Sequence, residues 1–442
     1  MTLPDYFLAD LPPQTNFSAE MIFEACRALK RNRDQYLARR STAAVIKTLS
    51  EVAAHWRRPD NAFRKLALHE GPEKCGFSKP TLAKGLDDFF CQLTPENFQS
   101  LLKQDIGDAA DPAASTRPCR RFWRGPEFLV HITTGNPPNP AWMSIILGLL
   151  ARSAQFVKCA AGASFLPRLF AHSIYDADPK LGACLEIADW PGGNAPLENV
   201  LFAEADCVTA TGADETLAAI RNQIPIHTRF LGYGHRVSFA FVARDALSQA
   251  VSAAADDVAA WNQLGCLSPH VIYVEEGAGL APEKFAEHLA AQLEQREADR
   301  PRGRVSPAES AAIASRRAIY DVRAAHSPET TRHWCSKNST AWTVVFEADP
   351  RFQLSCLNRF IYVKAVPNLN AALQAADGVR GRVSTVGLAA PEDKMPELAA
   401  HLARWGVTRV CPLGQMQNPP LTWRHDGQPA FGALISWTDF ES

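Results

Sequence analysis

The sequence predicts an α/β protein built from two parallel-sheet domains, with a helical N-terminal region and a C-terminal arm. Residues 128–242 and residues 270–388 each alternate short apolar runs with helical runs. Short strands separated by helices are typical of a parallel sheet with right-handed crossovers. The chain of 442 residues is too long for a single hydrophobic core, so two or three domains are expected.

The N-terminal region is predicted to be helical. Apolar residues recur at helical spacing in residues 17–39, and this spacing predicts an amphipathic helix. Further helices are expected over residues 43–57 and 95–103. Residues 117–124 are basic and contain a proline, which favours a surface connection to the first sheet.

The two alternations define the expected strands and helices. The first predicts strands over residues 128–132, 156–158, 184–187, 207–209 and 238–242, with helices such as 141–153 and 213–222 between them. The second predicts strands over residues 270–275, 342–347, 360–366 and 383–388, and helices over 282–297, 307–320, 369–376 and 391–405. The polar residues 295–304 are expected to form a solvated loop.

Composition excludes several classes of protein. The formal net charge of -1 gives no electrostatic reason to expect nucleic-acid or membrane-surface binding. The first thirty residues lack the basic-then-apolar pattern of a signal peptide, and the apolar runs are too short to span a bilayer. The 11 cysteines form no CxxC pairs, which favours reduced thiols in a cytoplasm over disulfides or a structural zinc site, and no metal is expected.

Cys266 is the candidate nucleophile. A helical run over residues 246–261 ends at Asn262, and a strand-like run begins at His270. A cysteine at this junction lies at an edge that a substrate can reach, and Gly265 allows a close approach of backbone or ligand. We interpret Cys266 as a thiol that takes up an acyl or aldehyde carbon. The alternative is a buried, inert cysteine, which fits most of the others.

Three strand-to-helix turns precede Cys266. Gly135 and Asn136 follow the first strand, at the edge where parallel sheets bind ligands, and the Asn136 amide could hold an oxyanion; an ordinary Asn-Pro turn is the alternative. Lys158 ends another strand and could reach a ribose hydroxyl or a phosphate, or be a surface lysine. Thr211 and Gly212 precede a helix N-terminus, which suits a phosphate.

The order and separations of these segments resemble the aldehyde dehydrogenase superfamily. Within it, the chain is similar to the acyl-CoA reductases of the LuxC type, on the segments 135–137, 234–238, 265–269 and 409–427. The resemblance implies an aldehyde dehydrogenase-like fold. It also implies roles for the turns: Asn136 at the oxyanion, Lys158 at the cofactor ribose, Cys266 as nucleophile, and Gly135, Thr211, Gly212 and Gly232 against the dinucleotide.

The resemblance also implies the domain order. We expect a helical region over residues 1–115, a Rossmann-like NADP-binding domain over 116–262, a catalytic domain over 263–408 and a C-terminal arm over 409–442.

Two departures from the superfamily pattern bear on the chemistry. Phe230 stands where hydrolytic members carry the glutamate that activates water, so we expect its ring to keep water from the acyl-enzyme and favour reduction. Pro350 stands where a ribose-binding glutamate is expected before Phe352, so that contact is in doubt. No acid occurs within three residues after Lys158, and we therefore expect NADPH as the cofactor.

The resulting hypothesis is NADPH-dependent reduction of a fatty acyl thioester to an aldehyde through an acyl-cysteine. His235, Arg236 and His270 are candidates for thiolate stabilisation, proton transfer or anchoring of the acyl donor. The expected partners are acyl-CoA or an acyl carrier, an acyl-protein synthetase and further copies of the chain. Alternatives are an aldehyde-oxidising dehydrogenase, an acyl carrier without redox activity, and a Cys-His hydrolase.

Overall fold

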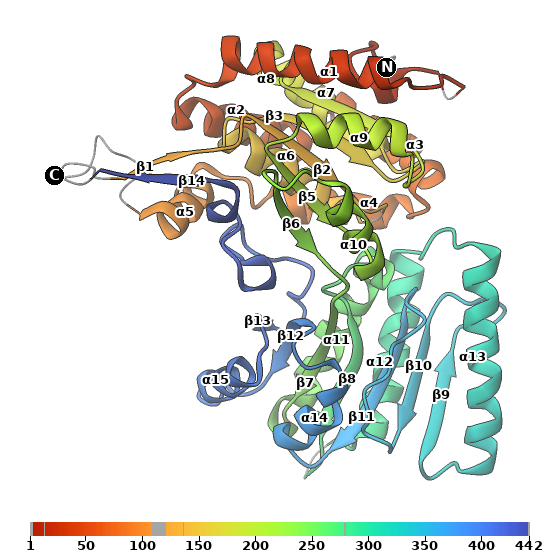
Figure 1. Cartoon of the computed structure of the whole chain (residues 1–442). Coiled ribbons are helices and arrows are strands. Elements are labelled where there is room, and N and C mark those ends of the chain that lie inside the picture. The colour runs from red at the N-terminus through yellow and green to blue at the C-terminus, as the bar shows by residue number, and fades with distance from the viewer. Residues whose placement is uncertain (1–2, 13, 108–120, 136, 278–279, 441–442) are drawn as a thin grey trace.

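The computed structural model describes residues 3–12, 14–107, 121–135, 137–277 and 280–440. Two open sheets lie one beyond the other, each layered with helices (Figure 1). The five-stranded sheet has the order β4-β3-β2-β5-β6, and the seven-stranded sheet has the order β13-β12-β7-β8-β11-β10-β9. The predicted α/β architecture with two largely parallel sheets and a helical N-terminal region is confirmed.

The five-stranded sheet is parallel throughout. Its strands are β2 (Phe128–Ile132), β3 (Ala154–Cys159), β4 (Leu185–Asp189), β5 (Cys207–Thr211) and β6 (Arg229–Tyr233), and its helices are α6 (Asn139–Leu150), α7 (Phe165–Ala177), α8 (Pro179–Gly182), α9 (Ala195–Glu204) and α10 (Asp214–Gln223). Most of these strands are apolar because helices cover both faces. The sequence did not predict edge strand β6. This strand pairs only with β5, and none of its residues is fully buried.

The seven-stranded sheet is parallel except for β9, which pairs antiparallel with β10 at one edge. Its strands are β7 (Val237–Val242), β8 (Pro269–Glu275), β9 (Thr331–Cys335), β10 (Thr343–Glu347), β11 (Phe360–Val366), β12 (Val383–Ala389) and β13 (Arg409–Pro412), and its helices are α11 (Leu247–Ala259), α12 (Pro282–Asp299), α13 (Pro307–His326), α14 (Leu369–Ala375) and α15 (Met395–Trp405). Helix α12 extends into residues 295–299, so the loop predicted over 295–304 is wrong there.

The grouping of two strands differs from the prediction. Strand β7 lies between β12 and β8 in the seven-stranded sheet, not in the first sheet, so the chain passes between sheets at residues 234–236 rather than near residue 262. Strand β13 also belongs to the second sheet, so the C-terminal arm begins after Pro412 rather than at residue 409. Both strands follow the same local pattern as their neighbours, and only the pairing shows their sheet.

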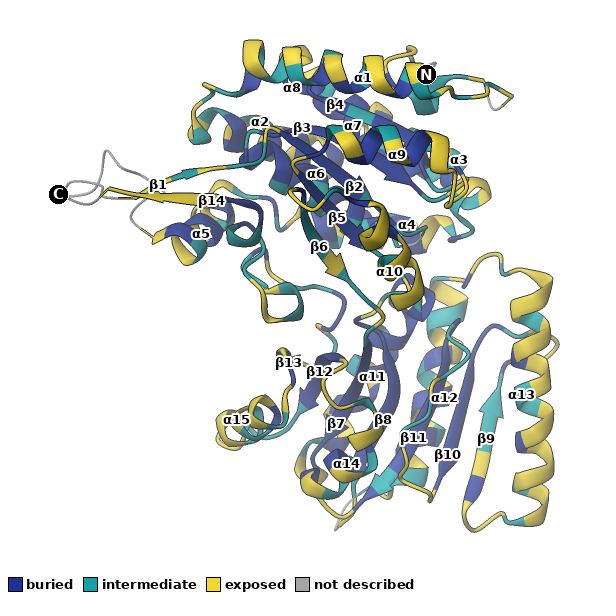
Figure 2. Cartoon of the chain, in the orientation of Figure 1, coloured by how far each residue is buried: buried dark blue, intermediate teal, exposed yellow. Residues whose placement is uncertain are grey.

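Five helices form the N-terminal region, and each begins at a residue whose side chain accepts a backbone N–H. These helices are α1 (Ala19–Asn32), α2 (Thr42–Trp56), α3 (Ala62–Cys75), α4 (Lys79–Phe90) and α5 (Pro95–Ile106), with caps at Ser18, Ser41, Asn61, Ser78 and Thr94. Such caps fix where a helix starts. Figure 2 shows most strands of both sheets buried, edge strands β6 and β9 partly exposed, and the outer face of α13 exposed.

A two-stranded antiparallel sheet projects from the body of the protein (Figure 1). Strands β1 (Arg121–Arg124) and β14 (Ser436–Asp439) pair antiparallel, so the C-terminal segment returns from the seven-stranded sheet to the N-terminal half. The surface connection predicted over residues 117–124 is therefore wrong for the last four residues, and residues 117–120 lie outside the described residues. No helix of the described chain is long and apolar enough to cross a membrane.

We predict that Gly85→Ala destabilises the protein. A methyl group at Gly85 would lie 2.1 Å from Cζ2 of Trp261, whose ring is buried against α4. Overpacking of this kind costs about 1 to 3 kcal/mol in the free energy of unfolding. Urea denaturation measures the change. Gly378→Ala is the matched control, because its methyl group would have no atom within 4 Å, and an equal loss in both variants would contradict the packing argument.

Candidate active site

Cys266 lies in a turn between a short 3-10 helix, Ala260–Gln263, and β8. The residue is exposed, as predicted for a cysteine at a helix–strand junction. Ser238 of β7 donates its hydroxyl to the Cys266 carbonyl oxygen at 2.8 Å, and the Ser268 N–H donates to the Gly265 carbonyl at 2.9 Å. These contacts fix the turn on the end of the seven-stranded sheet. The role of Cys266 as nucleophile stays a prediction.

The backbone that leads into this turn is left-handed over three residues. Trp261, Asn262 and Gln263 have φ values of 48°, 54° and 63°, which non-glycine residues adopt only when their surroundings impose it. Asn262 accepts from Arg359 at 3.0 Å, and Gln263 donates to the Phe360 carbonyl at 2.9 Å. Buried hydrogen bonds to the entry of β11 therefore hold the unusual path.

A second support comes from residues 414–417, beyond the last strand. Asp257 accepts the backbone N–H groups of Gly414 and Met416 at 2.5 and 2.9 Å. Burial raises the pKa of Asp257 to about 7, although these hydrogen bonds and Arg409 oppose the rise. Gln417 then donates to the Ser268 hydroxyl at 2.7 Å. The C-terminal segment thus holds the far end of the Cys266 turn.

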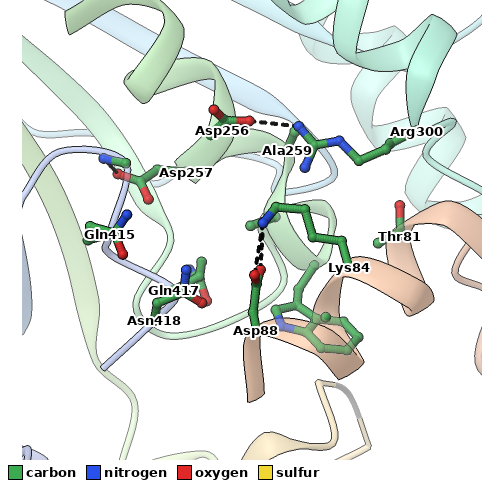
Figure 3. A pocket seen from close by; sticks show the side chains of 14 residues that line it. Thr81, Lys84, Asp88, Asp256, Asp257, Ala259, Arg300, Gln415, Gln417 and Asn418 are labelled. Carbon is green, nitrogen blue, oxygen red and sulfur yellow. Dashed lines mark hydrogen bonds and ion pairs between the residues drawn. The ribbon is translucent and has the colours of Figure 1, made fainter. Parts of the chain in front are cut away.

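A polar cavity of about 160 Å³ lies behind this support, between α4, the end of α11 and residues 414–418 (Figure 3). It holds two ion pairs, Lys84–Asp88 at 2.8 Å and Arg300–Asp256 at 2.6 Å. Figure 3 shows that α4 supplies one side of the cavity and the C-terminal segment the other. The two cations that line the cavity, Lys84 and Arg300, are both paired, so it does not favour an anion, and its polar lining does not favour an acyl chain.

The charges around Cys266 keep its thiol protonated. Desolvation raises the pKa of the thiol to about 11, and the Asp426 carboxylate adds to the rise. The guanidinium groups of Arg236 and Arg409 lower the pKa, but they do not offset the other two effects. At neutral pH the sulfur therefore requires a proton acceptor before it can act as a nucleophile.

Arg236 is the candidate residue that the structure brings to Cys266. It lies in the connection between β6 and β7, and its Nε donates to Asp426 at 2.9 Å. His235, next to it, is exposed, and its backbone N–H donates to Asp214 at 3.0 Å. The two neighbours thus have different surroundings, and only Arg236 is among the groups whose charge acts on the thiol.

His270 is buried at the start of β8 and is held neutral. The Ser355 N–H donates to His270 Nδ1 at 3.1 Å, so Nδ1 carries no proton and the neutral ring carries it on Nε2. Desolvation, with a smaller contribution from the charge of His235, lowers the pKa of His270 to about 4. The ring of Phe352 meets the His270 ring edge-on at 6.2 Å. These features fit a hydrogen-bonded structural residue better than a proton carrier at neutral pH.

The predicted cofactor residues meet at the carboxyl edge of the five-stranded sheet. Strand register places Lys158 beside Ile132 of β2, and places Ala210 of β5 beside Gly232 of β6. Gly135 follows β2, Thr211 ends β5, and Gly212 comes directly after it. This row is where parallel sheets bind dinucleotides. Asn136 lies outside the described residues, so its predicted oxyanion contact stays a prediction.

Lys158 is buried at this edge, and its surroundings fit a ligand rich in hydroxyl or phosphate oxygens. Its Nζ lies 5.6 Å from the centre of the Trp190 ring, and burial lowers the pKa of its ammonium group. The Trp190 Nε1 is buried and has no hydrogen-bond partner in the described part of the chain. An ammonium group and an unused N–H donor therefore stand together where a dinucleotide would lie.

Two carboxylates from elsewhere in the chain act on Lys158, although no acid occurs within three residues after it. The carboxylates of Glu198 and Asp189 both raise the pKa of Lys158 against the effect of burial. Asp189 ends the neighbouring strand β4, in register with Cys159, and accepts the Ser164 hydroxyl at 2.7 Å. Inspection of the residues that follow Lys158 could not find it, because parallel pairing brings it there from 31 positions further along the chain.

Phe230 packs in the first sheet. Its ring lies in the apolar cluster beneath α9 and α10, and the Arg221 guanidinium lies over it at 5.7 Å from the ring centre. These contacts give Phe230 a packing role in this sheet. The expectation that its ring keeps water from the acyl-enzyme stays a prediction.

Three residues of the site were missed in the sequence, Trp423, His425 and Asp426. His425 stacks on Tyr233 at 4.4 Å with the rings 3° from parallel, and its ring centre lies 4.7 Å from that of Trp423 at a tilt of 37°. Tyr233 ends β6, so this stack joins the cofactor edge of one sheet to the surroundings of Cys266 in the other. The tail motif that contains these residues was noted only as a resemblance, since nothing local indicates which side chains it faces.

The fold and the arrangement of these sites define an aldehyde dehydrogenase-like protein. The indole-3-acetaldehyde dehydrogenase AldA of P. syringae superposes with a TM-score of 0.72 at 14% identity, over 96% of this chain and 90% of that chain. The salicylaldehyde dehydrogenase of Pseudomonas putida G7 gives a TM-score of 0.70 at 14% identity, over 97% and 91%. The AldA structure holds NAD+. At this identity the likeness establishes the fold.

The chain belongs to the acyl-CoA reductase (LuxC) family, whose model matches residues 37–437. The long-chain acyl-protein thioester reductase of Aliivibrio fischeri is 24% identical over 322 residues, which are 71% of this chain and 63% of that protein. Its counterpart in Vibrio harveyi is 23% identical over 320 residues, 71% and 64%. The chain thus matches less than two thirds of the length of these relatives. The predicted family resemblance is confirmed.

In the described residues, no group of three or more His, Cys, Asp or Glu side chains is arranged to hold a metal ion. No disulfide joins the cysteines that the structure describes.

We predict that His270 makes stability depend on pH in acid. Its pKa is about 4 in the folded protein and 6.5 ordinarily, so the unfolded chain binds the extra proton. The contribution is complete above pH 6.5 and is lost as the pH falls towards 4. The full shift corresponds to about 3 kcal/mol. His270→Gln should flatten the fall in unfolding free energy between pH 6.5 and 4.5, measured with urea. An unchanged slope would contradict it.

Proposed function

We propose that the protein reduces a fatty acyl thioester to an aldehyde with NADPH through an acyl-cysteine at Cys266. The observation that carries the proposal is the exposed Cys266 turn beside Arg236 and Asp426, linked by the Tyr233–His425 stack to the cofactor edge. Membership of the acyl-CoA reductase (LuxC) family supports this chemistry. A cysteine in a turn at a sheet end, linked to the dinucleotide edge of the other sheet, is what acyl transfer followed by reduction requires.

The reaction has an acyl-transfer part and a reductive part. The Cys266 sulfur attacks the thioester carbon, and the thiol of the donor leaves. NADPH, when bound, supplies the hydride that reduces the acyl group. Collapse of the resulting thiohemiacetal releases the aldehyde and restores the Cys266 sulfur. We expect Lys158 and Trp190 to bind the cofactor. Arg409 donates to the carbonyls of Gln415 and Met416, and the adjacent Gln417 holds the Cys266 turn through Ser268, so this turn stays fixed through both parts.

The acyl donor is a long-chain thioester carried by CoA, a carrier or a partner protein. The names of the relatives, long-chain acyl-protein thioester reductases, support a protein-bound donor, and an acyl-protein synthetase is the corresponding partner. The β1–β14 sheet exposes Phe122 and Trp437, whose exposed fractions are 57% and 41%. These exposed aromatic side chains support self-association. A cytoplasmic location would keep the cysteines reduced.

Cys266→Ala is expected to abolish acyl-enzyme formation. Incubation with a fatty acyl-CoA in the absence of cofactor should add one acyl group to the wild-type protein, seen by intact mass. The variant should add none, because alanine offers no sulfur. Cys91→Ala is the control, since Cys91 is also exposed but lies on α4's C-terminus, and it should acylate normally. An adduct on Cys266→Ala would assign the nucleophile to another cysteine.

NADPH is expected to bind about tenfold more tightly than NADH, because Lys158 can pair with the 2'-phosphate. A charged hydrogen bond of this kind contributes about 1 to 3 kcal/mol, or ten- to hundredfold in affinity, and the nearby Asp189 reduces the gain. Fluorescence titration of both cofactors measures it. Lys158→Ala should remove the preference, and Asp189→Asn should increase it. Equal or tighter binding of NADH to wild type would refute the preference.

A further inference from the structure

A turn with two exposed arginines lies at the same edge of the seven-stranded sheet as Cys266. Strands β7, β8 and β12 run parallel to one another, so the residues that precede them meet at one edge. Cys266 precedes β8, and residues 378–382, which we call the arginine turn, precede β12. Arg380 and Arg382 of this turn are both exposed. The arginine turn is therefore a positively charged surface on the side of the sheet that carries the candidate nucleophile.

Hydrogen bonds fix the arginine turn relative to the Cys266 turn. Arg236 Nη1 donates to the Gly381 carbonyl at 3.2 Å. Two residues further on, the Ser238 hydroxyl donates to the Cys266 carbonyl at 2.8 Å. Only β7 lies between β12 and β8 in the sheet, and neighbouring strands are about 5 Å apart, so the two turns lie about 10 Å apart across the sheet. The same stretch at the start of β7 thus holds both turns.

The two guanidinium groups of the arginine turn are anchored but not neutralised. Arg380 Nε donates to the Trp405 carbonyl at 3.1 Å, and Arg382 Nη2 donates to the Gly378 carbonyl at 3.3 Å. Among the described residues, no carboxylate forms an ion pair with either arginine. A guanidinium has five N–H donors, so each group keeps its full charge and several donors for a ligand.

Gly381 leaves open space between the two arginines. Its φ of 77° lies in the left-handed region, which glycine adopts without strain. No atom lies within 4 Å of the place that a Cβ would take at this residue. The Gly381 N–H donates to no backbone acceptor among the described residues. Two guanidinium groups and a backbone N–H therefore flank an open surface, which is a set of donors that suits a phosphate.

We propose that the arginine turn binds a phosphate group of the acyl donor while the thioester reacts at Cys266. The proposal rests on the proposed function, because it takes Cys266 as the acyl acceptor. It names the class of donor, a thioester on a phosphopantetheine arm, which is the chemistry that CoA and a carrier protein share. This arm separates its phosphate from the thioester sulfur by an extended chain, so the phosphate site must lie away from the nucleophile, as the arginine turn does.

Other cations at hollows of the described surface are less suited to the donor phosphate. In the pocket formed by α12, α13 and β9, Lys284 and Arg332 both pair with glutamates, at 2.6 and 2.7 Å. The cations of the cavity behind the Cys266 turn are paired with aspartates in the same way. A paired cation must give up its partner before it binds a phosphate, whereas the arginine turn has none to give up.

The arginine turn and the proposed cofactor residues belong to different sheets. Lys158 is buried at the carboxyl edge of the five-stranded sheet, and the arginine turn is exposed at the amino edge of the seven-stranded sheet. A donor phosphate on the arginine turn leaves the edge at Lys158 free for NADPH. The donor and the cofactor are therefore expected to bind without competition, so that the acyl group is transferred while the reductant is already in place.

Three octanoyl thioesters test the proposal: octanoyl-CoA, octanoyl-phosphopantetheine and octanoyl-pantetheine, which has no phosphate. The rate of Cys266 acylation is followed by mass spectrometry of its peptide, without cofactor and at low ionic strength. In the double variant Arg380→Gln and Arg382→Gln, this rate should fall about ten- to hundredfold with the two phosphate donors, because charged hydrogen bonds are lost. It should stay unchanged with octanoyl-pantetheine, which also shows that the variant is folded. Salt should weaken the preference of the wild type for the phosphate donors.

A fall with octanoyl-CoA alone would identify the nucleotide phosphates of CoA as the bound groups. Arg39→Gln is the matched control, because Arg39 is exposed in the N-terminal region, and it should leave all three rates unchanged.

The other outcomes overturn the proposal. An equal fall with all three donors would mean that the arginine turn only maintains the structure around Cys266. Unchanged rates with all three would mean that it binds no part of the donor. A loss with octanoyl-CoA in Lys158→Ala, but not in the arginine variant, would place the donor phosphate at the cofactor edge. A failure of the proposed function is distinguishable, because the wild-type protein would then carry no acyl group on Cys266 from any donor.

Discussion

The position of the nucleophile depends on a hydrogen-bonded clamp between the end of α11 and a loop some 150 residues further along the chain. Asp257 takes two backbone N–H groups of this loop, and Arg409 donates to two of its carbonyls, at 2.6 Å to Met416 and 2.8 Å to Gln415. A loop with both its donors and its acceptors bound in this way has little freedom. Gln417 transfers that rigidity to the Cys266 turn through Ser268, so residues 409–417 are part of the site and not only of an arm.

The site lies where the chain crosses between the two sheets. One crossing is the connection at residues 234–236, and the other is the C-terminal segment that returns towards the two-stranded β1–β14 sheet (Figure 1). The Arg236–Asp426 ion pair joins these two crossings, and both of its charges act on Cys266. A shift of one sheet relative to the other would therefore change the electrostatics of the thiol directly. This gives a physical reason for one pair to serve both as a link between domains and as part of the chemistry.

The sequence predicted what local pattern determines, and it failed where pairing decides. Apolar strands such as β2 and β8 and capped helices such as α2 were predictable, as were the location of Cys266 at a junction and of Lys158 at a strand end. The sheet of β7 and the approach of Asp189 to Lys158 depend on which strands are neighbours, and no local pattern encodes that choice. The same limit concealed Asp426, because its importance comes from Arg236, 190 positions away.

Two left-handed runs stand side by side beneath the nucleophile. Residues 261–263 enter the Cys266 turn, and Leu357, Asn358 and Arg359 enter β11 with φ values of 58°, 54° and 64°. Arg359 is fully buried, pairs with Glu297 at 2.8 Å and binds Asn262 of the other run. A buried ion pair contributes little net stability, since desolvation of both charges opposes their attraction. Arg359 is buried and Glu297 is partly exposed, so removal of Glu297 would leave the Arg359 charge uncompensated, and Arg359 also joins the two runs through Asn262. The strained entry to Cys266 is thus stabilised by a second strained entry, and the turn keeps its geometry because neither run can relax alone.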